Sequence, residues 1–424
     1  MGSPNEATLS GMPSELQVRI MGELDIDSVR RLSITNKRLR EVCRTHEKYI
    51  NFTILQNVIN SLPKGVRPFA VALYAANHTD WKAQWPLPSL PELYNNIHTF
   101  GRRYLDRNNW RLPIERKEAT LKLVSEMIPE ILSFHAIVEE WTLKFMNLSL
   151  SKVERHEGQP PMAPPSISEI TRIQQAFYIR EIARELFPFF IGEPGPEGVN
   201  DMPFDMFWHY FAPWENQIVA GIDEFFHLRY NEIYLAGELS PTPQGWEAEN
   251  YDDFVNELGG WFIKYGLRHL HEINDWDTLI NSMKEMFEED EQYDPRPFRK
   301  IHYSVNIWAG CTWLRPTEHD ITIRTLGIDH LMQRFTPGDS GPIDSWFFHF
   351  VYESTTESPL IQFPTLADTD SRWWDRARIE ATFPNAMPTM EDIQIKGTVE
   401  KAGTYDAGPY VLSSDPDFCK EIGY

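Results

Sequence analysis

The sequence has few cysteines and no long hydrophobic run. Its 424 residues include three cysteines, Cys43, Cys311 and Cys419, which lie far apart and form no C-x-x-C pair. This spacing excludes a disulfide framework and a cysteine-based zinc module, and it is usual in a reducing compartment. No stretch reaches the roughly 18 apolar residues of a membrane helix, and the N-terminus lacks the pattern of a signal peptide. We therefore expect an intracellular protein, cytoplasmic and/or nuclear, with no membrane partner.

Positive charge is also scarce, but unevenly so. The chain has 40 Lys and Arg against 62 Asp and Glu, a net charge of −22. Residues 1–50 carry 8 basic against 7 acidic residues, so the remainder carries 32 against 55. Such an acidic surface repels phosphate backbones, and we expect no nucleic-acid partner. The length fits a small module attached to a larger body.

Several motifs of nucleotide and protease chemistry are missing. There is no G-x-x-x-x-G-K-[ST], no G-x-G-x-x-G after a strand, no H-E-x-x-H and no fixed-period repeat. The run Gly338-Asp-Ser-Gly-Pro looks like the nucleophile loop of a trypsin-like protease, but a largely helical chain lacks the matching His segment. Because these residues favour turns, we interpret the run as a turn.

Three isolated pairs leave metal binding as an alternative. Glu224-Phe-Phe-His227 would put a carboxylate and an imidazole on one helical face, as in half of a di-iron helix pair. His78-Thr-Asp80 has the spacing of two non-haem iron ligands, and His269-Leu-His271 would chelate a metal across a strand. No second Glu-x-x-His or further ligand set accompanies them. We predict no metal, no cofactor and no catalytic residue.

The sequence between Leu9 and Val42 predicts three short amphipathic helices. In the first, Pro13 suits the first helical position. Leu16, Ile20 and Leu24 then recur every four residues and form one apolar stripe.

The second and third helices have their own capping residues, Asp25 and Asp27 before one and Asn36 before the other. Three such short helices bury too little area to be stable alone, so their remaining apolar side chains should contact a partner. In each helix apolar residues three apart share a face: Val29 with Leu32, and Leu39 with Val42. The pattern indicates a docking module.

The two ends of this module carry motifs. Met12-Pro-Ser-Glu-Leu resembles the Leu-Pro-x-Glu-Leu opening of an F-box, and Thr35-Asn-Lys-Arg-Leu-Arg-Glu-Val resembles its Val-Ser-Lys-Arg-Trp-Arg-Glu-Leu ending, with Leu39 replacing a frequent Trp. The resemblance implies an F-box over residues 8–50 that docks on the Skp-type adaptor of SCF-type cullin-RING ubiquitin ligases. It implies contact or supporting positions at Met12, Pro13, Leu16, Ile20, Leu24, Val29, Leu32 and Leu39.

Residues 51–424 are expected to form a predominantly helical body. Apolar spacing predicts a helix of about 30 residues from Leu121, which Pro129 should kink or split. Two more amphipathic helices are predicted around Ile170, Ile173 and Phe177, and around Trp214, Ile218, Ile222 and Phe225. In the last third, the β-prone runs 303–308 and 346–352 indicate a few strands. The fold class is mainly α.

The resemblance therefore implies a non-catalytic substrate-recognition subunit, similar to fungal-type F-box proteins with a helical, non-repeat body. The body would hold an unknown target protein, and the adaptor would connect the chain to cullin. Two alternatives stay open. One is an adaptor-bound scaffold without a ligase role, and the other is an enzyme in the helical body with an appended F-box.

Overall fold

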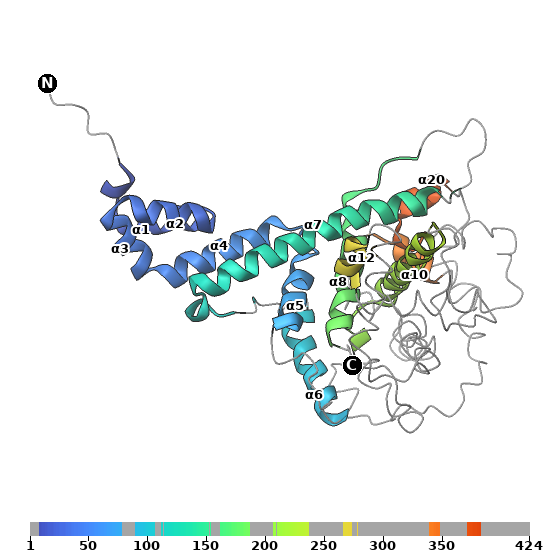
Figure 1. Cartoon of the computed structure of the whole chain (residues 1–424). Coiled ribbons are helices and arrows are strands. Elements are labelled where there is room, and N and C mark those ends of the chain that lie inside the picture. Colours follow the sequence, from blue (N-terminus) through green and yellow to red (C-terminus); the bar gives the residue numbers. More distant parts are fainter. Residues whose placement is uncertain are drawn as a thin grey trace, which may run out of the picture.

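A computed structural model gives the fold of the chain (Figure 1). Every element of defined bounds in the described part is a helix, and that part contains no strand, so the mainly α fold is confirmed. The structure describes residues 8–78, 90–106, 114–151, 162–186, 210–236, 266–273, 339–347 and 371–382, together with Leu112, Val153, Phe207, Trp208 and Thr278.

The N-terminal module, residues 8–50, consists of short helices as the sequence predicts. The Asp25 carboxylate accepts a hydrogen bond from the Ser28 amide at 2.8 Å, and Asn36 Oδ1 accepts one from the Arg38 amide at 2.8 Å. These caps satisfy backbone N–H groups that have no partner within their own helices. The elements are η1 (Leu9–Gly11), α1 (Ser14–Gly22), α2 (Ile26–Thr35) and α3 (Lys37–Thr45).

The expected place of Pro13 is wrong by one residue. Pro13 is the N-cap of α1, with φ −54° and ψ 146°, and not its first helical residue. The ring fixes only φ, so Pro also suits an N-cap, where ψ is extended. The Pro13 carbonyl still accepts from the amides of Leu16 and Gln17 at 3.1 Å, which closes the first turn.

Helix α4 (Glu47–Ser61) joins the module to the body. Ile50 and Ile54 belong to the buried cluster of the N-terminal module, whereas Leu55 and Ile59 belong to the large core of the body. The helix is continuous through residue 50, the position at which the sequence divides into an expected module and body. One rigid element therefore contributes to both cores.

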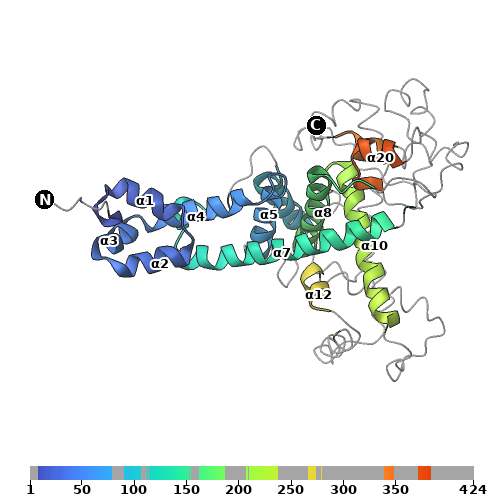
Figure 2. The same cartoon turned by 90° about the horizontal axis from the view of Figure 1, so that it is seen from above.

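Helix α7 (Leu121–Ser151) lies beside α4 (Figure 2). Both helices begin near the N-terminal module: the Leu121 amide donates to the Glu47 carboxylate at 3.2 Å, and Asn51 Nδ2 donates to the Ala119 carbonyl at 3.2 Å. The expected split at Pro129 does not occur, because α7 runs unbroken through it. Burial on both sides of this proline holds the helix together.

Helix α8 lies at the centre of the body and packs against α5, α7 and α10. Its residues Ile173 and Phe177 are fully buried, as are Ile222 and Phe226 of α10, so the two amphipathic helices expected here are confirmed. The elements of this part are α5 (Arg67–His78), α6 (Leu90–Phe100), the π-turn η2 (Gly101–Leu105), η3 (Arg116–Glu118), α8 (Ile167–Leu186) and α10 (Pro213–Ala236).

Short C-terminal helices complete the body: α12 (Gly266–Glu272), α18 (Gly341–Phe347), η6 (Ser371–Trp373) and α20 (Arg376–Thr382). The expected strand from Trp346 is wrong for its first two residues, which end α18. Asp339 Oδ1 accepts from the Gly341 amide at 2.8 Å and the Arg376 amide at 2.7 Å, and this capping starts a helix despite the β-prone side chains. Residues 303–308 and 348–352 lie outside the described residues.

The turn expected at Gly338-Asp-Ser-Gly-Pro is wrong for its last two residues: Ser340 is a bend, but Gly341 and Pro342 begin α18, and Gly338 lies outside the described residues. A side chain at Gly341 would collide with the backbone of Trp374 and Arg376. The close approach of the two C-terminal segments therefore requires glycine at this position.

Candidate adaptor-docking surface

Two polar side chains fix the start of α1. Gln17 is fully buried, and its Nε2 donates to the carbonyls of Leu9 at 3.0 Å and Met12 at 2.9 Å. Arg38 Nη2, from α3, donates to the same Met12 carbonyl at 3.1 Å. The loop before α1 is thereby tied to α3. Sequence periodicity misses both residues because neither is apolar.

The eight expected contact or supporting residues divide by burial. Val29 and Leu39 are each 3% exposed and lie in the core of the module, and Leu24 and Leu32 pack against that core. Met12 and Ile20 are half-buried, and Pro13 and Leu16 are exposed. The buried side of α1 is formed by Gln17, Val18 and Met21, so the stripe of Leu16 and Ile20 is turned toward solvent.

Leu16 and Ile34 are the most exposed large apolar side chains of the module, at 48% and 71%. Ile34 lies on α2 and was not among the expected contact residues, although it lies within the expected module. Its exposure depends on how α2 packs, which periodicity alone does not give. Exposed apolar side chains on so small a module are what a docking surface requires.

Charged groups around this surface are solvated. Hydrogen bonds from the Ser28 hydroxyl and amide lower the pKa of Asp25. Two ion pairs, Arg30 with Asp27 at 3.2 Å and Arg44 with Glu41 at 3.0 Å, are both largely exposed. Exposed pairs of this kind contribute little to stability, so the module depends on its small apolar core.

Residues 9–51 match the family model of the F-box domain. The chain contains an F-box domain. F-box domains in general bind Skp-type adaptors, and they indicate a substrate-recognition role of the SCF type. No curated protein and no solved structure matches the chain. The remaining features of the F-box protein lie in its body.

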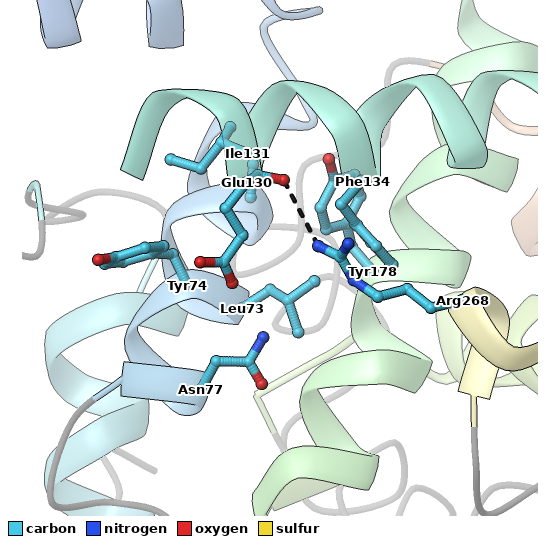
Figure 3. A pocket seen from close by; sticks show the side chains of 9 residues that line it. Leu73, Tyr74, Asn77, Glu130, Ile131, Phe134, Tyr178 and Arg268 are labelled. Carbon is cyan, nitrogen blue, oxygen red and sulfur yellow. Dashed lines mark hydrogen bonds between the residues drawn. The ribbon is translucent and has the colours of Figure 1, made fainter. Parts of the chain in front are cut away.

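The body of the F-box protein has a small recess between α5, α7, α8 and α12 (Figure 3). It contains about 230 Å³ of empty space, a volume that includes the part open to solvent. Its walls include the rings of Tyr74 and Phe134, and its polar groups come from Asn77, Glu130 and Arg268. Burial, with Glu130 and Glu126 nearby, raises the pKa of Tyr74 to about 12, so this hydroxyl stays neutral.

Of the three pairs that left metal binding as an alternative, two have a member outside the described residues. In the described part of the chain, no group of three His, Cys, Asp or Glu side chains is placed to hold a metal ion. Glu224 is exposed on α10, while the side chain of His227 lies outside the described residues, as does Asp80. His78 is described: its Nε2 lies 2.6 Å from Glu130 Oε2.

The third pair, His269 and His271, lies on helix α12 and not on a strand. Residues two apart point in different directions on a helix, and these two have separate partners. His269 Nδ1 lies 3.2 Å from the Tyr230 hydroxyl, and His271 Nδ1 lies 3.3 Å from Trp141 Nε1. Burial lowers the pKa of His269 to about 4, so this imidazole is neutral at pH 7.

None of the helices with described residues combines the length and the apolar character that crossing a membrane requires.

Proposed function

We propose that this F-box protein is the substrate-recognition subunit of an SCF-type cullin-RING ubiquitin ligase, acting in the cytoplasm and/or nucleus. Its F-box docks on a Skp-type adaptor, the adaptor connects it to cullin, and the body holds a target protein. The F-box match at residues 9–51 carries this proposal.

Exposure of apolar side chains supports the docking step. The side chains of Pro13, Leu16 and Ile34 are exposed, although burying these apolar side chains would lower the free energy. Val29 and Leu39 lie in the buried cluster of the F-box, where they support its helices. In this reading Pro13, Leu16 and Ile34 contact the adaptor directly, and Met12 and Ile20 extend the contact.

The link between F-box and body supports the recognition step. Helix α4 has 15 residues, which corresponds to about 22 Å. It enters both cores, and α7 runs beside it, so the body is held at a fixed distance from the docking end. A fixed distance suits a subunit that positions a target lysine near a ubiquitin thioester, because such positioning makes the transfer effectively intramolecular.

The chain itself supplies no acid, base or nucleophile in this mechanism. Its contribution is binding and geometry, and the ubiquitin-conjugating enzyme recruited by cullin performs the chemistry. The adaptor-only scaffold differs from this proposal in one observable respect: it would bind the adaptor without cullin.

The test is co-expression of the full chain with a Skp-type adaptor and cullin, followed by purification through a tag on the chain. The native chain should retain both partners. The Pro13→Ala, Leu16→Ala double variant should lose both, because interface anchors typically cost about 2 kcal/mol or more each when truncated. Both residues are exposed, so the variant should stay folded.

A matched control is the Leu132→Ala, Leu143→Ala double variant on α7, whose side chains are 40% and 57% exposed. It should retain both partners. Failure of the native, folded chain to bind the adaptor would refute the proposal, and binding of the adaptor without cullin would favour the scaffold.

A further inference from the structure

Arg268 on α12 differs from the arginines of the neighbouring helix α8. Arg172, Arg180 and Arg184 each pair with at least one carboxylate. Arg268 has no carboxylate partner among the described residues. Its Nη2 makes one long hydrogen bond, 3.5 Å, to the Glu130 backbone carbonyl. A guanidinium has five N–H donors, so most of the donors of Arg268 remain for another acceptor.

The fold places this side chain in the recess. The Glu181 carboxylate, 1% exposed, accepts from the Leu267 amide at 3.0 Å. Gly266 adopts φ +81°, and a side chain there would collide with Glu181 and Arg184. Burial alone would raise the pKa of Glu181, but Arg184 and Arg180 outweigh it and keep the carboxylate ionised. A buried ionic network therefore fixes the residue pair just before Arg268.

The walls of the recess suit a small polar group. The Arg268 guanidinium lies over the Phe134 ring, 5.2 Å from its centre, in a cation–π contact. Figure 3 shows it reaching toward α7, with Leu73 and Tyr178 around the space. Glu130 is the one carboxylate among the lining residues, and His78 Nε2 lies 2.6 Å from its Oε2.

The size of the recess restricts which ligands can bind there. Most of its space is open to solvent, and the enclosed part has room for about one water-sized group. A planar carboxylate at the open mouth of the recess would match the two-pronged donor of the Arg268 guanidinium.

We propose that this recess binds the carboxylate of an Asp or Glu side chain presented by the target protein, with Arg268 as its anchor. The inference rests on the proposed function, since it assigns a feature of the target. Asn77 lines the same recess, but its amide nitrogen donates to the Glu185 carboxylate, so Arg268 is the donor that remains for the ligand.

The test uses the full chain bound to its adaptor and a peptide library in which one position is fixed as Asp, Glu, Asn, Gln or phosphoserine. The native chain should select Asp or Glu. Arg268→Gln should weaken the selected peptide at least about tenfold, because hydrogen bonds to charged groups contribute on the order of a tenfold to hundredfold change in affinity. Fluorescence anisotropy measures the loss.

Arg229→Gln is the matched control, because it removes an arginine from an exposed pair on α10 and should leave binding unchanged. A melting curve reports the fold of each variant. Arg268→Lys, which keeps the charge but not the planar donor, should show an intermediate loss. Equal selection of Asn or Gln, preference for phosphoserine, or affinity unchanged in Arg268→Gln would each overturn the carboxylate assignment. Retention of the adaptor by every variant separates this failure from failure of the proposed function.

Discussion

The F-box and the body of this protein are stabilised in different ways. The buried cluster of the F-box contains Val18, Met21, Val29, Leu39, Ile50 and Ile54, with no aromatic side chain among its described members. The body core instead contains fully buried rings such as Trp208, Phe226 and Trp373. Because aromatic side chains bury more area than aliphatic ones, the body gains more stability per residue. The F-box leaves apolar side chains available for a partner.

The two regions also differ in how deeply their ion pairs are buried. Ion pairs of the F-box are exposed, whereas Arg180 and Asp223 of the body pair at 2.9 Å with side chains only 5% and 2% exposed. Burial raises the pKa of Asp223 even though Arg180 is adjacent. Removing one partner of a buried ion pair strongly destabilises a protein, because the other charge is left buried without a partner. Removing either partner of the Arg180–Asp223 pair should therefore destabilise the body.

The largest expected loss of stability comes from Trp373→Ala in the body. Trp373 is fully buried, its Nε1 donates to Ser149 Oγ at 3.2 Å, and its ring packs against Phe145 and Trp374. We expect a loss of about 3–5 kcal/mol in the free energy of unfolding, measured by denaturant titration. Leu143→Ala on the exposed side of α7 should change it by no more than about 0.5 kcal/mol. Equal losses in the two variants would contradict the assignment of this core.

Met21→Ala should separate the two regions. Met21 is fully buried in the F-box, and its truncation should cost about 2–5 kcal/mol. In so small a core we expect the F-box to unfold first and adaptor binding to be lost. Hydrogen exchange of α1 to α3 against that of α8 and α10 measures this. If both regions exchanged together, α4 would couple them into one cooperative unit.

The smallest expected effect is a change in pH dependence. The folded state holds the pKa of His269 at about 4, below the ordinary value of 6.5. Between these values the unfolded chain binds more protons than the folded chain, so this residue makes stability fall as the pH drops from about 6.5 to 4. His269→Gln should flatten that decline relative to the native chain. Urea unfolding at pH 7, 5.5 and 4.5 provides the measurement, and an unchanged slope would argue against a buried, neutral His269.

Sequence periodicity predicted the helices of this protein well because each apolar stripe is local. The caps Asp25 and Asn36, the long helix from Leu121 and the helices around Phe177 and Trp214 all follow from neighbouring residues. The split expected at Pro129 and the strand expected from Trp346 both fail where local propensity disfavours helix. Burial on both sides outweighs it at Pro129, and capping by Asp339 outweighs it before Trp346.

The candidate docking surface was harder to predict from the sequence. On α1, Leu16 and Met21 are both apolar, but one is 48% exposed and the other fully buried. A nine-residue helix has two adjacent apolar stripes, and only packing against α3 and α4 decides which one faces inward. Gln17 and Arg38 could not be found by hydrophobic pattern, because they act through hydrogen bonds to the backbone.

The sequence by itself determined the helical class, the N-terminal F-box and the uneven distribution of charge, since these depend on composition and on residues close together in the chain. The tertiary structure decided the outward face of α1, the continuity of α4 between two cores, and the position of Arg268 beside Glu130, 138 residues away in sequence. Burial and pairing depend on what packs from distant segments, and no local pattern records that.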